Sequence, residues 1–134
     1  MREIKFRAWD KNSKKMVGEV TKIEFANNRE HINSYGHHDV LSAGSEGVPY
    51  RGIAVDCEIM QFTGLTDKKG VEIYEGDIVR GKDGLNYKVF WYEEGAQFMF
   101  DDFDRTSKGK IGEPLDYDDS EVIGNIHENK ELLK

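Results

Sequence analysis

Four residues of the chain, His31, His37, His38 and Asp39, carry side chains of the types that bind transition metals. Imidazole and carboxylate groups are ligands for Zn²⁺ and Ni²⁺. Neighbouring side chains in a strand point to opposite faces, so His37 and His38 would share one ion only in an irregular loop. Because this spacing matches no defined metal motif, we expect a loop without metal, and a metal-dependent enzyme is the third hypothesis for function.

Other spacings come near to a catalytic or ion-binding motif and fail at one position. His127 and Glu128 resemble the start of a zinc-protease helix, but the second histidine that this motif requires is replaced by Glu131. Residues 102–113 have carboxylates spaced like a calcium loop, but Ser107 stands where the sharp turn needs glycine. The sequence therefore predicts a protein that is not an enzyme and holds no cofactor and no metal ion.

Charge separates the two ends of this 134-residue chain, whose formal net charge is −7. The overall negative field repels phosphate backbones and disfavours non-specific nucleic-acid binding. Residues 1–22 nevertheless hold seven Lys or Arg against three acids, while residues 101–134 hold five against ten. Two solvated faces account for this asymmetry, and head-to-tail attraction between subunits is the alternative.

The sequence predicts that the elements carrying these residues are short strands. Residues 3–9 alternate apolar and polar side chains, residues 10–15 have turn chemistry, and residues 16–25 resume the alternation, so the first 25 residues predict a β-hairpin. Residues 26–52 show no sustained period and predict a long excursion with a short strand or one turn of helix.

The second half predicts a small closed sheet. Strands are expected over 53–65, 76–81, 87–92, 97–100 and 121–126, with tight turns between several of them and a terminal helical turn that Asn129 caps. Tyr87, Val89 and Trp91 alternate with Lys88, Phe90 and Tyr92, and we assign the first three to the core. Closing such strands into an SH3-like barrel removes exposed sheet edges, and the N-terminal hairpin would pack on that barrel.

Three blocks of the sequence resemble the YopX family of bacteriophage and prophage proteins: "MREIKFRAWD", "IMQFTGLTDKKGVEIYEGDIV" and "EVIGNIHENKELL". The resemblance implies one domain over residues 1–134, with an N-terminal lobe at 1–62 and an SH3-like barrel at 63–134. It also implies a protein of the bacterial host cytoplasm. The resemblance supplies no catalytic residues to carry over to this chain.

The function expected from these features is non-catalytic protein interaction, either self-association or binding to a host or phage partner. Trp9, Phe90 and Tyr92 lie opposite the predicted core faces and would contact the partner, unless both strand faces are buried. The alternative is a nucleic-acid-binding accessory protein that uses the basic N-terminal hairpin, with Arg2, Lys5, Arg7, Lys11, Lys14 and Lys15.

Membrane and disulfide chemistry are not predicted. No run of 18 apolar residues occurs, and the N-terminus lacks the apolar stretch of a signal peptide. The single cysteine, Cys57, permits no internal disulfide and is expected to be a small buried side chain. These features predict a cytoplasmic protein with no membrane partner.

Overall fold

A computed structural model of the chain describes residues 2–17, 20–25, 38–42, 57–103 and 117–133. These residues are mainly β-structure, as the sequence predicts, and their helical content is limited to two short 3₁₀ turns. The elements are β1 (Phe6–Asp10), β2 (Lys15–Val17), β3 (Val20–Phe25), β4 (His38–Ser42), β5 (Cys57–Thr66), β6 (Glu72–Tyr74), β7 (Asp77–Arg80), β8 (Asn86–Tyr92), β9 (Gln97–Asp102), η2 (Tyr117–Asp119), β10 (Glu121–Asn125) and η3 (Lys130–Leu133).

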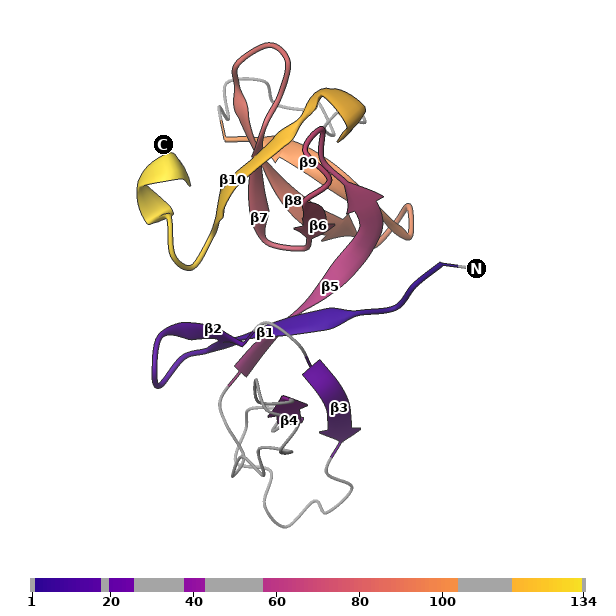
Figure 1. The fold of residues 1–134 in the computed structure, drawn as a ribbon, viewed down its shortest axis with the longest axis vertical. Coiled ribbons are helices and arrows are strands. Elements are labelled where there is room, and N and C mark those ends of the chain that lie inside the picture. The colour runs from indigo at the N-terminus through magenta and orange to yellow at the C-terminus, as the bar shows by residue number, and fades with distance from the viewer. Residues whose placement is uncertain (1, 18–19, 26–37, 43–56, 104–116, 134) are drawn as a thin grey trace. The chain divides into compact units, whose positions relative to one another are not determined.

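The strands form two four-stranded antiparallel sheets, ordered β2-β1-β5-β6 and β10-β7-β8-β9, and a separate β3-β4 pair (Figure 1). The chain divides into two compact units, one of residues 4–61 and one of residues 1–3 with 62–134. Strand β5 belongs to both, with residues 57–61 in the first unit and 62–66 in the second.

The unit of residues 4–61 begins with a hairpin of β1 and β2, which is shorter than the predicted one. β1 pairs with β2 through Ala8↔Val17 and Asp10↔Lys15, and on its other side with β5. Asp10 closes the turn, because its carboxylate accepts bonds from the Asn12 N–H at 2.9 Å and the Ser13 hydroxyl at 2.6 Å. Ala8 lies in the middle of these three strands and is fully buried.

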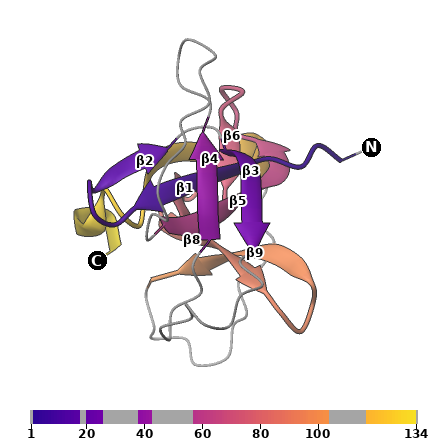
Figure 2. The ribbon, with the colours of Figure 1, turned by 90° about the horizontal axis from the view of Figure 1, so that it is seen from below.

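The second limb predicted for the hairpin, residues 16–25, is not one strand. β2 ends at Val17, and β3 pairs with β4 from Val20↔Ser42 to Phe25↔His38 (Figure 2). The short strand expected within residues 26–52 is thus β4. It pairs with residues 20–25, which local alternation assigned to a hairpin with β1. Sequence alternation identifies a strand but not its partner, which explains the error.

The second unit contains the predicted run of strands β7, β8 and β9, with β10 returning beside β7. Its core is formed by Ile73, Val79, Val89 and Phe100, with Leu65, Tyr87 and Val122 packed against them. Val89 and Phe100 face each other across β8 and β9, so the alternation in "YKVFWY" and "QFMF" places one apolar face on this core. This part of the unit resembles half of a barrel.

An irregularity in the β5–β6 pair falls at Gly64, which has a φ of +87°. The hydroxyl of the preceding residue, Thr63, donates to the Ile73 carbonyl at 2.7 Å and accepts from the Leu65 N–H at 3.2 Å. A glycine is suited to this position because residues with a Cβ rarely adopt such a φ. The bulge lets Thr66 still pair with Glu72 on the far side.

The C-terminal turn forms as predicted, but Asn129 does not cap it with its side-chain oxygen. Asn129 Oδ1 instead accepts from the Asn125 N–H at 3.2 Å, while the Asn129 backbone carbonyl receives the Leu132 N–H at 3.0 Å. The side chain of Asn129 also lies against Gly124, where an added Cβ would be 2.4 Å from Oδ1. β10 is therefore tied to the turn that follows it.

No helix among the described residues is long and apolar enough to cross a membrane.

Candidate interaction surface at the β8–β9 hairpin

The side of the β8–β9 hairpin that packs on the core continues past the core toward the turn. Tyr87, Val89 and Trp91 alternate along one side of β8, and Trp91 pairs with Phe98 across the strands. Val89 is almost fully buried in the core, whereas Trp91, two residues nearer the turn, has 39% of its surface exposed. The prediction that Trp91 belongs to the core is therefore wrong: the apolar alternation of β8 continues to a position near the turn where the side chain is exposed.

Trp91 and Phe98 hold each other in an edge-to-face arrangement. Their ring centroids are 5.0 Å apart and the ring planes are inclined by 71°. This geometry brings the positive edge of one ring to the negative face of the other and is worth about 1 kcal/mol beyond area burial. The exposed indole is thus held in place by a neighbouring ring, which lowers the entropy lost when a partner contacts it.

The turn that joins the strands is fixed by Tyr92. An added Cβ at Gly95 would lie 2.6 Å from the Tyr92 ring, so the ring packs directly over the glycine backbone. The Tyr92 hydroxyl donates to Glu94 Oε2 at 2.8 Å. This bond, with a smaller contribution from burial, raises the pKa of Tyr92 and keeps it a donor. Ala96 completes the turn with a φ of +48° and donates its N–H to the Glu93 carbonyl.

We call Trp91, Phe98, Glu93 and Glu94 the aromatic tip. Both glutamates are exposed in the turn after Trp91, and the Glu94 carboxylate bonds to Tyr92, which points to the opposite side of β8 from Trp91. An exposed aromatic ring attracts cationic groups through its quadrupole. The aromatic tip is therefore suited to contact a basic, partly apolar surface.

The six residues predicted to contact a partner are divided between the two units, three in each. Tyr92 supports the turn of the aromatic tip, and Phe90 lies farther along β8, in register with Met99. Arg7 and Trp9 lie on β1, and Arg7 approaches the Met60 sulfur at 3.9 Å. The two remaining residues precede β1: Lys5 is half-buried, and Arg2 lies beside Gly64, where an added Cβ would be 3.4 Å from Arg2 Cγ.

The buried polar side chains of the described residues all bond to the backbone. They are Thr63, Asp67, Asp77, Ser120 and Asn125. Asp77 accepts from the Tyr74 N–H at 2.8 Å, Ser120 donates to the Tyr117 carbonyl at 2.9 Å, and Asn125 accepts from two successive N–H groups. These groups stabilise turns and strand ends, which is the use expected of buried polar atoms in a scaffold.

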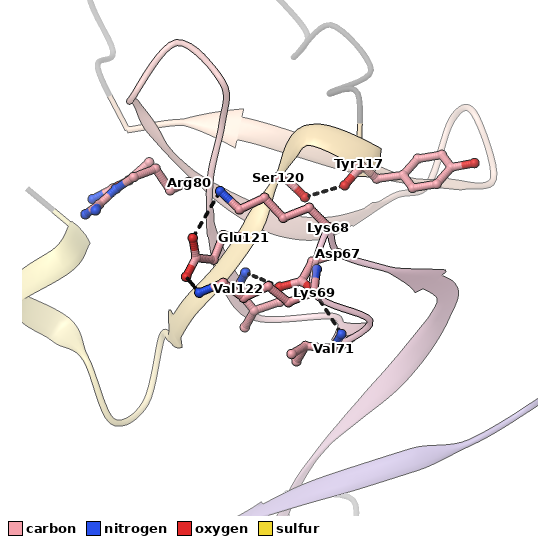
Figure 3. A network of polar contacts seen from close by, with 10 residues as sticks. Asp67, Lys68, Lys69, Val71, Arg80, Tyr117, Ser120, Glu121 and Val122 are labelled. Atoms are coloured by element: carbon pink, nitrogen blue, oxygen red, sulfur yellow. Dashed lines mark hydrogen bonds and ion pairs between the residues drawn. The ribbon is translucent and has the colours of Figure 1, made fainter.

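Asp67 is the centre of the largest of these arrangements (Figure 3). Its Oδ1 accepts from the N–H groups of Lys69 at 2.8 Å and Val71 at 2.9 Å, and its Oδ2 accepts from Val122 at 2.9 Å. Burial tends to raise the pKa of this carboxyl, but the three N–H groups and the Lys69 charge together hold it below the ordinary value. The sequence indicated the local turn but not the bond to Val122.

Two lysines beside Asp67 share one carboxylate. Lys68 Nζ lies 3.1 Å from Glu121 Oε2, and Lys69 forms an ion pair with Oε1 of the same side chain (Figure 3). Hydrogen bonds from Lys69 and then Lys68 lower the pKa of Glu121. Because these groups are exposed, the pairs contribute little to stability. They add a polar contact between the turn and β10.

Two of the four candidate metal ligands belong to the described residues. His31 and His37 lie outside the described residues, and His38 and Asp39 are successive residues of β4. Within the part of the chain that the structure describes, no three His, Cys, Asp or Glu side chains form a group that could hold a metal ion. Cys57 is half-buried rather than fully buried, which corrects the expectation for this residue.

Comparisons with known proteins agree with the resemblance of the sequence blocks. The family model described as YopX protein matches residues 5–134. A crystal structure of protein EF1440 from Enterococcus faecalis is 26% identical, covers 100% of both chains and has a TM-score of 0.56. The search of curated proteins gave no match. The likeness to a solved structure thus extends over the whole chain.

Proposed function

The chain belongs to the YopX family, and from this premise we propose that it is a non-catalytic protein-interaction module. The observation that carries this proposal is the aromatic tip, where a large ring is exposed yet held in place by Phe98. Tryptophan is the residue type most enriched at the energetic centres of protein interfaces. An indole held by a second ring and set on a fixed turn has the features of such a centre.

The way the fold uses its buried polar groups supports the same proposal. All five buried polar side chains described above bond to backbone groups, and both oxygens of Asp67 accept N–H bonds. They act as parts of a scaffold that presents the β8–β9 hairpin. We further propose that the unit of residues 1–3 and 62–134 is an SH3-like barrel on which the N-terminal hairpin packs.

Substitution of Trp91 tests this function. Immobilised wild-type protein is compared with Trp91→Ser for capture of itself and of proteins from a bacterial lysate. Leu85→Ser is the matched control, because Leu85 is also an exposed apolar residue next to a turn of the same unit. We expect Trp91→Ser to weaken capture by about 2 kcal/mol, roughly thirtyfold, and Leu85→Ser to leave it unchanged. Equal capture by all three proteins contradicts the proposal.

Nucleic-acid binding through the basic N-terminal residues is the second candidate. Arg7 and Trp9 alternate with Ala8 on β1, so a cation and an aromatic ring share one side of a strand. That pairing is used to bind single strands. Binding of a labelled oligonucleotide should then fall steeply with added salt, and no binding at low salt removes this candidate.

A further inference from the structure

We propose that Asp83 and Gly84 form a site of isoaspartate formation that the Tyr87 hydroxyl holds closed in the folded protein. The two residues follow each other in the turn between β7 and β8, where residues 82–85 are all exposed. An aspartate followed by glycine is prone to this change, because glycine has no side chain to hinder attack by its own nitrogen. The site lies wholly within the unit of residues 1–3 and 62–134.

Isoaspartate formation reroutes the backbone through the side chain of the aspartate. The Gly84 nitrogen attacks the side-chain carboxyl carbon of Asp83, and water leaves to give a cyclic imide. Water then opens the imide at the main-chain carbonyl, so the water lost is regained and no other reagent is consumed. The attack is faster on the protonated acid, because a carboxylate resists nucleophiles and has no good leaving group. The product has one additional CH₂ group in its backbone.

Hydrogen bonds in the folded turn engage both reacting groups. Asp83 Oδ1 accepts from the Leu85 N–H at 3.0 Å, and Oδ2 accepts from the Tyr87 hydroxyl. The Gly84 N–H, which carries the attacking nitrogen, donates to the Gly81 carbonyl at 3.0 Å. Attack therefore requires the Asp83 carboxyl to leave its two donors and the Gly84 N–H to leave its acceptor.

The Tyr87 hydroxyl also keeps the carboxyl ionised. Its hydrogen bond is the largest cause that lowers the pKa of Asp83, followed by the bond from the Leu85 N–H. A hydrogen bond to the carboxylate favours that form over the neutral acid. The held side chain and the lowered pKa both slow the attack, so removal of the hydroxyl should accelerate it.

The sheet, rather than the turn, sets the position of Tyr87. This residue pairs with Val79 in β7 and with Asp102 in β9, and its ring packs against the core. The turn itself is open: Gly84 has a φ of +81°, and an added Cβ there would meet nothing within 4 Å. Water can therefore reach the site, while a side chain anchored in the sheet supplies one of the bonds that hold it closed.

Isomerisation would alter the turn that sets the register of β7 and β8. The Gly81 N–H donates to the Leu85 carbonyl at 2.9 Å, and Arg80 pairs with Asn86 beside this bond. A backbone longer by one CH₂ group between these residues would strain both contacts. The modified protein should therefore unfold at a lower urea concentration than the unmodified protein.

Ageing of Tyr87→Phe tests the role of the hydroxyl. The matched control is Tyr92→Phe, which loses the tyrosine–carboxylate bond to Glu94 at the other end of β8. Both variants and the wild type are kept in mildly acidic buffer below their unfolding transitions. Peptide mass spectrometry with electron-transfer fragmentation measures isoaspartate at residue 83. Folded Tyr87→Phe should form it about fivefold faster than wild type, the factor expected for one hydrogen bond, and Tyr92→Phe at the wild-type rate.

The same proteins unfolded in guanidinium chloride provide the reference rate. All three should then isomerise equally fast, and faster than the folded wild type, because the hydrogen bonds of the turn are gone. Folded Tyr87→Phe that isomerises no faster than wild type overturns the proposal. An equal acceleration by Tyr92→Phe also overturns it, since this result would indicate general loosening. Wild type that isomerises as fast when folded as in guanidinium chloride contradicts the closed site.

Discussion

The carboxylate of Asp67 accepts a 2.9 Å hydrogen bond from the backbone N–H of Val122, which joins the turn after β5 to the start of β10. The two residues are 55 positions apart in the sequence. The backbone bond from Lys68 N–H to the Ser120 carbonyl, at 3.0 Å, runs alongside it. This pair of contacts closes the second unit, so the hairpin that carries the aromatic tip depends on it.

Asp67→Asn should destabilise the protein strongly. The amide retains one oxygen, but its NH₂ group would face an N–H donor at one of the three bonds. With one charge-assisted bond lost and a buried donor left unsatisfied, we expect a loss of about 3 kcal/mol in the free energy of unfolding. Urea unfolding measures this loss. Asp118→Asn, at an exposed position, is the control and should change stability by less than about 0.5 kcal/mol.

The same carboxyl should make stability depend on pH in acid. Because folding lowers the pKa of Asp67, the unfolded state binds more protons, and stability falls as the pH falls. The contribution is fully present above the unfolded value of about 3.9 and is lost as the pH drops through the folded pKa. The stability difference between wild type and Asp67→Asn should therefore shrink below about pH 4. A constant difference from pH 7 to pH 3 would contradict this assignment.

Gly124→Ala should destabilise the C-terminal turn. The added methyl would lie 2.4 Å from Asn129 Oδ1 and 2.9 Å from its Cβ, so the Asn129 side chain must move and release the Asn125 N–H. We expect a cost of about 1–3 kcal/mol. In an Asn129→Gly background the same substitution should cost less, because the clashing atoms are gone. Costs that simply add in the double variant would show that the two residues do not interact.

Ala96→Gly should stabilise the β8–β9 turn. Ala96 has a φ of +48°, which is unfavourable for a residue with a Cβ and open to glycine. The expected gain is up to about 1 kcal/mol in thermal or urea unfolding. Ala8→Gly, at a fully buried strand position, should instead lose stability. Partner binding should be retained in Ala96→Gly, since the substitution leaves Trp91 and both glutamates in place.

Local alternation predicted most strands because each side of a strand meets one environment. "YKVFWY" and "QFMF" gave β8 and β9, and the turn residues of "TDKKG" gave the loop at Asp67. Two features could not be predicted from local alternation or turn residues. The β3–β4 pair depends on strand partners, and the Asp67–Val122 bond joins residues distant in the sequence.

The candidate surface was missed for a related reason. Trp91 continues the apolar alternation of the core side chains, so the sequence assigned it to the core with Tyr87 and Val89. Its position directly before "YEEG" was the available signal, because a strand residue next to an acidic turn is near the end of the sheet. Alternation reports the face of a strand, while burial also depends on how far the opposing side chains extend.

The most direct measurement follows the solvent accessibility of the Trp91 indole during association. Trp9→Phe leaves Trp91 as the single tryptophan, and a neutral quencher reports its exposure by fluorescence. We predict efficient quenching in dilute protein, and protection as the concentration rises or when a partner captured by the wild type is added. Leu85→Ser in the same background should behave identically. Quenching that stays the same in the free and the associated protein would contradict the claim that this chain acts through the aromatic tip.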